Sequence, residues 1–402
     1  MEDFYLARQA IYNRGLDVFA YELLFRDDQQ KKTANILDGN SATSQVIINA
    51  FLHIGLDKIV GDKRAFINLP HDMLVHEDIL QLPREHVVLE VLEDIPPTPT
   101  VIGAVRNLID NGFYIALDDF IYNDEFRPLV DLAQIIKIDI LSLSSYQIRE
   151  QVNLLRGNGR KLLAEKVETI EQYQLCRSLG FDYFQGYFAA QPHIIAGQRP
   201  PANRLMILHL LGKLQNPAVE FDEIEDVISK DLSLSYRVLR TINSSLFNLP
   251  AKVESIRTAI QFIGLKQLKH LVSLIALANF DDKPSELVML SLIRAKFAEL
   301  ICKSLAQADP EVTFTAGLFS MLEALLDYPM VDILKELPLS DELSSALLDH
   351  EGNIGTILDM VESYEKGSWD QIELPENSDI NITSLYLESI NWAEKSLKNI
   401  GN

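Results

Sequence analysis

The feature that most constrains the fold is a set of polar residues placed within or directly after apolar, strand-like runs in the first half of the chain. From Asn68 onward these polar residues follow one another at steps of 22, 28, 19, 28 and 20 residues, which is about the length of a strand, a helix and two short loops. A polar side chain at the end of each parallel strand is typical of a (β/α) barrel, whose active site lies at that edge. The residues are Glu22, Asn68, Glu90, Asp118, Asp119, Lys137, Glu165 and Gln185.

The chemistry of this set favours a divalent metal ion. Carboxylate and amide oxygens are hard ligands that suit Mg²⁺ or Mn²⁺. The adjacent Asp118 and Asp119 hold two negative charges close together, which is unfavourable without a cation. Lys137 stands between isoleucines, where its ammonium needs water or a carboxylate. Taken singly, each acid can be a strand end facing water, the aspartate pair a turn, and Gln185 a structural amide. Together they favour one metal site at the barrel mouth.

Two periodicities alternate in the first half, which predicts a mainly parallel sheet. Helical patterns cover residues 43–54 and 101–110, and the second ends at Asn111-Gly112, a common helix stop. Strand-like runs cover residues 18–25, 64–69, 87–92, 114–117 and 135–138.

The character of the chain changes at residues 196–202, where one glycine and two prolines indicate a linker. Helical patterns dominate afterwards, so the fold class expected is an α/β TIM-like barrel over residues 1–195 followed by an all-α domain over residues 203–402. A loop is expected near residues 368–377. The predicted helices cover residues 205–214, 221–230, 234–242, 255–262, 265–277, 285–306, 313–326 and 382–397.

The composition restricts the partners and the compartment. A net charge of -22 repels a long nucleic acid, whereas a small anionic ligand held on a divalent metal is compatible with it. The two cysteines offer no disulfide framework or cysteine-based metal site, which fits a reducing cytoplasm. No secretory signal and no uninterrupted apolar stretch of about 18 residues occurs, so a cytoplasmic chain without a membrane span is expected. Residues 271–280 are interpreted as a buried core helix.

The first 195 residues resemble the EAL family of cyclic di-GMP phosphodiesterases. Eight stretches carry the resemblance, in the family's order: Arg8-Gln9-Ala10-Ile11, Tyr21-Glu22-Leu23-Leu24-Phe25-Arg26, Phe66-Ile67-Asn68, Leu89-Glu90-Val91-Leu92-Glu93, Leu117-Asp118-Asp119-Phe120, Lys137-Ile138-Asp139, Ala164-Glu165-Lys166-Val167-Glu168-Thr169 and Phe184-Gln185-Gly186-Tyr187. The resemblance implies a variant TIM-like barrel that hydrolyses one phosphodiester of cyclic di-GMP and gives linear pGpG.

The resemblance also implies a role for each matching residue. Lys137 would orient or deprotonate the attacking water, and Glu165 and Gln185 would support metal-bound waters. Glu93 would anchor the loop that couples dimerisation to metal binding, through which a homodimer is expected. The substrate contacts would be Arg26, Gln9 and Glu168. Two ions, Mg²⁺ or Mn²⁺, would be held by Glu22, Asn68, Glu90, Asp118 and Asp119.

The chain departs from the family pattern at three places. The signature Glu-Ala-Leu is Glu22-Leu23-Leu24, and the usual glycine after Glu165 is Lys166. The loop after the aspartate pair, usually Phe-Gly and small residues, reads Phe120-Ile121-Tyr122-Asn123. Glycine adopts positive φ values that isoleucine and tyrosine resist, so regulation or the level of activity can differ here.

The second half resembles the HDOD domain, a helical relative of the HD phosphohydrolases. An HD hydrolase needs a His-Asp pair for its metals, but the corresponding position reads Phe319-Ser320-Met321-Leu322, so a non-catalytic, partner-binding module is implied. The scattered His209, His270 and His350 are interpreted as packing or surface residues. The matching stretches are Asp231-Leu232-Ser233-Leu234, Val238-Leu239-Arg240-Thr241-Ile242-Asn243-Ser244, Ile256-Arg257-Thr258-Ala259-Ile260, Ile263-Gly264 and Thr315-Ala316-Gly317-Leu318-Phe319.

Two functional hypotheses remain open at the level of sequence. In the first, the chain is a cytoplasmic, metal-dependent cyclic di-GMP phosphodiesterase that its HDOD domain regulates or localises through an unknown protein partner. In the second, a degenerate EAL domain binds cyclic di-GMP or a protein without turnover. The complete set of ligand residues favours the first, and the altered loop favours the second. A purely structural scaffold leaves the carboxylates and Lys137 without a reason.

Overall fold

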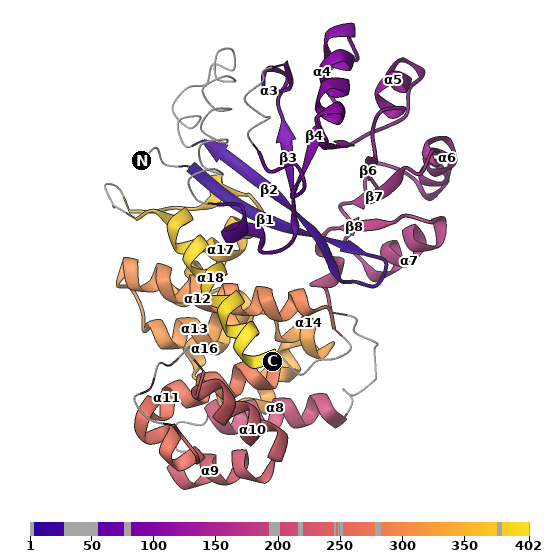
Figure 1. Ribbon diagram of the computed structural model, residues 1–402. Helices are drawn as coiled ribbons and strands as arrows, with labels where there is room; N and C mark the ends of the chain where they lie inside the picture. Colours follow the sequence, from indigo (N-terminus) through magenta and orange to yellow (C-terminus); the bar gives the residue numbers. More distant parts are fainter. Residues whose placement is uncertain are drawn as a thin grey trace. The chain divides into compact units, whose positions relative to one another are not determined.

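The computed structural model describes residues 4–27, 55–75, 82–192, 202–215, 220–244, 247, 249, 252–277, 283–375 and 380–401 (Figure 1). The predicted helix at 43–54 and residues 196–201 of the predicted linker lie outside these ranges. The chain forms two compact units. The first comprises Met1–Ala189 with Glu365–Trp369, and the second comprises Ala190–Tyr364 with Asp370–Asn402.

The first unit is a closed eight-stranded barrel in which the strands follow one another in chain order. The strands β2 to β8 run parallel to their neighbours, whereas β1 pairs antiparallel with both β2 and β8. The barrel confirms the predicted fold class, although the predicted strands do not include β1. The strands are β1 (Phe4–Asn13), β2 (Val18–Asp27), β3 (Arg64–Leu69), β4 (Val87–Val91), β5 (Tyr114–Leu117), β6 (Ile135–Asp139), β7 (Lys161–Glu165) and β8 (Tyr183–Gln185).

Local sequence signals fix the ends of the crossover helices. Capping boxes open α6 and α7, at Ser144 with Gln147 and at Thr169 with Gln172. Gly180 closes α7 in the left-handed conformation, with φ 94°. The helices of this unit are α2 (Asp57–Val60), α3 (His71–Val75), α4 (Pro99–Asp110), α5 (Arg127–Val130), α6 (Ser145–Leu155) and α7 (Ile170–Leu179), with the short turns η3 (Asp124–Phe126) and η4 (Tyr187–Ala189).

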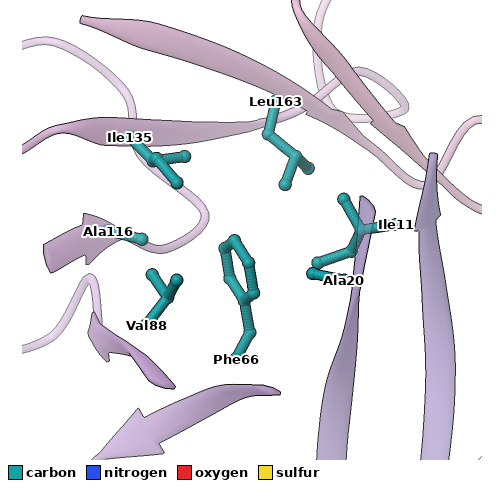
Figure 2. Packing of buried hydrophobic residues seen from close by; sticks show 7 residues of the cluster. All are labelled: Ile11, Ala20, Phe66, Val88, Ala116, Ile135 and Leu163. Atoms are coloured by element: carbon teal, nitrogen blue, oxygen red, sulfur yellow. The ribbon is translucent and has the colours of Figure 1, made fainter. Parts of the chain in front are cut away.

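A layer of apolar side chains fills the barrel interior, and each of the strands β1 to β7 contributes one of them (Figure 2). Side chains in a strand alternate between the two faces, so the residue two positions further along points into the same interior, one layer away. That next layer is polar in every strand. On the antiparallel β1, Gln9 of the polar layer lies two residues before Ile11 of the apolar layer. On β2 to β7 the apolar residues are Ala20, Phe66, Val88, Ala116, Ile135 and Leu163. The polar residues two positions later, toward the carboxyl ends of these strands, are Glu22, Asn68, Glu90, Asp118, Lys137 and Glu165. This apolar layer, called the apolar floor below, thus fixes the position of the candidate site along the barrel axis.

The second unit is helical in its described part, as predicted. Helix α11 contains a break at Gly264, whose φ is 80°, where the sequence predicts a turn between two helices. Its helices are α8 (Ala202–Gln215), α9 (Phe221–Lys230), α10 (Leu232–Ile242), α11 (Ile256–Leu277), α12 (Ser285–Leu305), α13 (Pro310–Phe319), α14 (Leu322–Leu326), α15 (Met330–Glu336), α16 (Asp341–Asp349), α17 (Gly352–Glu365) and α18 (Ile382–Gly401), with η5 (Trp369–Gln371) inside the predicted loop.

The single helix predicted over residues 313–326 is wrong, because two helices, α13 and α14, cover this stretch. Asp309 caps α13 and Pro310 occupies its first turn, which starts the helix earlier than the apolar pattern suggests. At its other end Ser320 Oγ donates to the Gly317 carbonyl at 2.8 Å, and Met321 leaves the helical region. A Cβ on Gly317 would lie 2.5 Å from the Arg294 carbonyl oxygen, so glycine permits the close approach of α12 and α13.

Helix α11 has the length and mean hydropathy of a membrane span, but 56% of its most apolar window is buried inside the protein. Core helices of globular proteins share that pattern. The predicted core helix at 271–280 agrees with α11 as far as Leu277, and residues 278–280 lie outside the described part.

Candidate active site at the carboxyl ends of the barrel strands

The centre of the site is the ammonium of Lys137, whose side chain is 0% exposed. Four carboxylates from four strands or strand ends surround it. Its Nζ lies 2.6 Å from Glu90 Oε1 and 2.6 Å from Asp118 Oδ1. It lies 2.8 Å from Glu165 Oε1 and 3.2 Å from Glu22 Oε2. The acids and lysine predicted from sequence to share one pocket therefore converge, with the exception of Asp119.

Three amide side chains complete this layer. Gln185 Nε2 donates to Glu22 Oε2 at 2.6 Å and to Gln9 Oε1 at 2.8 Å. Asn68 Nδ2 donates to Glu22 Oε1 at 3.4 Å. The strand register brings these residues together. Gln9 lies directly opposite Glu22 in the β1–β2 pair, and Gln185 lies opposite Ile11, two residues from Gln9, in the β1–β8 pair. Glu22 thereby accepts hydrogen bonds from Gln185, Asn68 and Lys137.

Burial of so many acids changes their protonation. Burial in the barrel raises the pKa of Glu165 to about 8, and it raises the pKa values of Glu90 and Asp118 as well, with the charge of Glu22 adding to each shift. Glu22 differs, since Lys137 and its amide donors outweigh desolvation and lower its pKa. The surrounding carboxylates raise the pKa of Lys137 well above its usual range. At neutral pH the layer therefore holds the Lys137 ammonium and a proton on Glu165.

These shifts predict how the stability of the metal-free protein depends on pH. Between pH 4.5 and about 8 the folded state keeps the Glu165 proton that the unfolded chain releases, so the folded state binds more protons. The free energy of unfolding should then fall across this window, by on the order of 5 kcal/mol. Denaturant titrations in EDTA at several pH values measure it. Glu165→Gln should flatten the decline, and an equal slope in wild type and variant would contradict the assignment.

The oxygens of this layer fit a hard divalent cation. Six buried acceptor atoms of this layer have no hydrogen-bond donor in the described ranges. Glu90 Oε1 and Asp118 Oδ1 are ion-paired with Lys137, which leaves Asn68 Oδ1, Glu90 Oε2, Glu165 Oε2 and Gln185 Oε1 without a partner. Buried acceptors without a partner are costly and call for a ligand such as a metal ion or its waters. No three His, Cys, Asp or Glu side chains of the described part are already arranged as a metal centre, because the Lys137 ammonium lies between the acids. Binding an ion there requires the acids to lose protons and shift from the lysine.

Asp119 belongs to a second cluster at the same rim. Its backbone is left-handed, with φ 42°, and its carboxylate pairs with Lys166. Lys166 Nζ lies 3.1 Å from Asp119 Oδ2 and 2.7 Å from Asp139 Oδ2. The structure therefore separates the two adjacent aspartates and gives each its own lysine. Sequence reasoning assigned no role to Asp139 or Lys166. Asp139 lies two residues beyond Lys137, a spacing that could have marked it.

The altered loop is stabilised without glycine. The backbone N–H of Tyr122 donates to Gln151 Oε1 at 2.8 Å, and the Tyr122 hydroxyl donates to Asp124 Oδ1 at 3.0 Å. Asn123 caps η3 by accepting from the Glu125 N–H. The left-handed residue is Asp119, and residues 120–123 are absent from the positive-φ positions of the described chain. The loop therefore does not need the conformational freedom that glycine gives.

The predicted substrate and loop residues lie differently. The Arg26 guanidinium packs over the Tyr5 ring at 5.3 Å and the Trp369 ring at 5.2 Å, within the first unit. Glu22 lies four residues before Arg26 on β2, so the two side chains point to the same face of the strand. The side chains of Glu93 and Glu168 are exposed, and no contact links them to the Lys137 cluster in the described residues.

Comparison with known proteins identifies the two units. The EAL domain matches residues 3–192, and the HDOD domain matches residues 201–331. The cyclic di-GMP phosphodiesterase CdgJ of Vibrio cholerae is 36% identical over 92% of this chain and 86% of its own length. The uncharacterized protein YuxH of Bacillus subtilis is 34% identical over 96% of this chain and 97% of its own.

This chain belongs to the EAL–HDOD family. The resemblance predicted from its motifs is confirmed in both halves. Among solved structures, the EAL–HDOD chain is similar to the Bacillus subtilis YkuI protein, which has an EAL domain and was crystallised with the substrate c-di-GMP and calcium. That likeness covers 57% of this chain and 71% of YkuI at 20% identity, with a TM-score of 0.40.

The helical half of this EAL–HDOD protein offers no ligand where an HD hydrolase would need one. Phe319, Met321 and Leu322 are buried apolar side chains. His209 is exposed, and His270 stacks on Phe314 with 4.7 Å between the ring centres. His350 Nδ1 lies 2.5 Å from Asp359 Oδ1. The three histidines thus lie in surface or packing positions.

Proposed function

We propose that this EAL–HDOD protein is a metal-dependent phosphodiesterase that hydrolyses cyclic di-GMP to linear pGpG. One observation carries the proposal. Eight polar side chains of the types expected for this reaction converge in a single layer above the apolar floor of the barrel. The relation to CdgJ, which is named a cyclic di-GMP phosphodiesterase, supports the same substrate.

Glu22, Asn68, Glu90 and Asp118 are the residues that would hold a divalent ion, Mg²⁺ or Mn²⁺ in our proposal, with Asp119 contributing to a second. Bound ions would supply Lewis-acid polarisation of the phosphate and a lowered pKa for an attacking water. The protein's own contribution is a dry, rigid frame, since Glu90 and Lys137 are fully buried and their strands are paired on both sides.

The proton-transfer roles can be divided between Lys137 and Glu165. A lysine whose pKa is raised stays protonated and cannot accept a proton, so Lys137 orients water and neutralises charge. Glu165 Oε1 lies 2.8 Å from Lys137 Nζ, and Glu165 Oε2 has no hydrogen-bond donor, so this oxygen is placed to accept a proton from a water that Lys137 orients. We therefore assign water deprotonation to Glu165 and water orientation to Lys137 and Gln185.

Substrate recognition would fall to side chains around this layer. Arg26 offers a planar set of donors for a phosphate or a guanine edge. Gln9 lies beside Gln185 in the polar layer, and Glu168 lies exposed in the segment after β7. Glu93 would anchor the loop after β5 in a homodimer formed through the EAL domain. The HDOD domain would bind a protein partner in the cytoplasm.

A second candidate function is cyclic di-GMP binding without turnover. One observation favours it, namely that Asp119 is paired with Lys166 and not directed at the Lys137 cluster. Loss of one metal ligand would leave a nucleotide site with an incomplete catalytic centre.

A product assay separates the two functions. Purified full-length protein with Mn²⁺ or Mg²⁺ should convert cyclic di-GMP to pGpG, as followed by chromatography, and EDTA should stop the reaction. Excess metal should restore it. Cyclic di-GMP binding by calorimetry with no pGpG after hours would replace the enzyme with the sensor.

A further inference from the structure

The cluster of Asp119, Asp139 and Lys166 is assembled by three consecutive parallel strands. Asp119 follows β5, Asp139 ends β6 and Lys166 follows β7, so their backbones meet at the rim that carries the candidate site. Lys166 takes a left-handed conformation, with φ 55°, which few non-glycine residues adopt. Asp119 is left-handed as well. Two such residues place this ammonium between the carboxylates.

The backbone around both residues is hydrogen-bonded. The Phe120 N–H donates to the Lys137 carbonyl at 3.0 Å, directly after Asp119, and the Val167 N–H donates to the Gln185 carbonyl at 2.9 Å, directly after Lys166. A Cβ at Gly186 would lie 2.1 Å from the Val167 carbonyl oxygen, so that side of the rim is closely packed. The unusual conformations are thus held by the barrel.

From this geometry we infer that Lys166 is a tethered cation that competes with the second divalent ion for Asp119. The inference rests on the proposed function, since it concerns how that site binds its metals. The lysine satisfies Asp119 and Asp139 at once, at 3.1 and 2.7 Å. A metal ion bound by Asp119 must displace the Lys166 ammonium from that carboxylate. The displaced ammonium stays nearby, and its positive charge repels the ion. A second ion at Asp119 therefore binds more weakly than it would without Lys166.

Lys166 does not weaken the binding of the first ion in the same way. In the described residues, no hydrogen bond or ion pair joins Lys166 to Glu22, Asn68 or Glu90, and Asn68 Oδ1 and Glu90 Oε2 have no hydrogen-bond donor. Lys166 is 48% exposed, so it can swing away when the second ion binds at high concentration. The protein should consequently respond to metal concentration in two separated steps.

Counting bound Mn²⁺ in the full-length protein tests the inference. Calorimetry and Mn²⁺ electron paramagnetic resonance should show one tight ion in the wild type and a weaker second ion. Lys166→Gln should tighten the second ion roughly tenfold or more, the scale of removing a partly screened unit charge beside a divalent ion. The spectrum of a spin-coupled pair of Mn²⁺ ions should then appear at a lower Mn²⁺ concentration. Lys166→Gly, which suits the left-handed backbone, should do the same if the glutamine variant folds poorly.

Two controls keep the charge effect specific. Lys166→Arg retains the cation and should leave the second ion weak. Lys161→Gln removes a lysine of similar exposure at the other end of β7, where its Nζ lies 2.8 Å from Asp182, and should leave both ions unchanged. An unaltered second affinity in Lys166→Gln and Lys166→Gly would overturn the inference. Weaker cyclic di-GMP binding in EDTA together with unaltered metal affinity would make Lys166 a phosphate contact instead.

The outcome is separable from the proposed function. Stronger binding of the second ion in the variants with no pGpG from any of them would uphold the role of Lys166 and reject the phosphodiesterase. Formation of pGpG with an unchanged affinity for the second ion would uphold the phosphodiesterase and reject the role of Lys166. Absence of Mn²⁺ binding in every form would reject both.

Discussion

Lys137→Met is expected to abolish pGpG formation and to lower the free energy of unfolding of the metal-free protein by about 3–5 kcal/mol, the usual cost of removing one partner from a buried ionic network. The ammonium is the common neighbour of Glu22, Glu90, Asp118 and Glu165. Methionine has a similar length and no charge, so the four carboxyl groups would face one another without a cation. Denaturant unfolding in EDTA measures the loss of stability.

Divalent metal should reverse much of this loss. An ion bound among the same oxygens replaces the missing positive charge, so saturating Mn²⁺ should stabilise Lys137→Met more than it stabilises the wild type. Lys63→Met provides the control, because Lys63 is a half-exposed lysine just before β3. That variant should alter neither stability nor turnover beyond a small amount.

Nucleotide binding distinguishes a catalytic from a structural role of Lys137. Lys137→Met, or Lys137→Ala, should still bind cyclic di-GMP in the presence of metal while giving no product, because the lysine acts on water and not on the nucleotide. Loss of binding together with loss of product, in a protein that remains folded with Mn²⁺, would make Lys137 a structural residue. Retained turnover would contradict its role altogether.

The site was largely predictable because strand periodicity links it to the core. Phe66, Val88 and Ile135 belong to the apolar layer, and the residues two positions later are Asn68, Glu90 and Lys137. A polar residue at a position that alternation directs into the barrel is a stronger signal than a polar residue beside an apolar run. The convergence on Lys137 follows from that alternation and the carboxyl-end rule for parallel strands.

The pairing of Asp119 with Lys166 could not be predicted from the same rule. Alternation places Asp118 inside, and the next residue faces wherever the backbone turns after β5 ends at Leu117. That turn depends on a left-handed φ at Asp119 and on the Lys166 ammonium, which comes from a segment 47 residues later. Strand β1 was not predicted for a related reason, because the adjacent polar residues Arg8 and Gln9, which point to opposite faces of the strand, interrupt its apolar pattern.

Glu22→Ala is expected to reduce pGpG formation to at most ~1% of the wild-type rate. Losing a residue that only supports a metal ligand already costs about 10- to 100-fold, and Glu22 would be a direct ligand. Its pKa is lowered, so it is the acid of the Lys137 cluster that carries its charge most readily and is ready for a cation. A discontinuous product assay with Mn²⁺ measures the loss.

The fold should tolerate this change far better than the activity does. The charge of Glu22 helps to raise the pKa values of Glu90, Asp118 and Glu165, so its removal lets one of these acids ionise beside Lys137 in its place. Stability in EDTA should therefore fall much less than in Lys137→Met. Glu85→Ala, which removes an exposed acid in the turn before β4, should leave turnover and stability unchanged. Equal losses of stability in Glu22→Ala and Lys137→Met would mean that Glu22 is the obligatory partner of the lysine and that the other three acids cannot replace it.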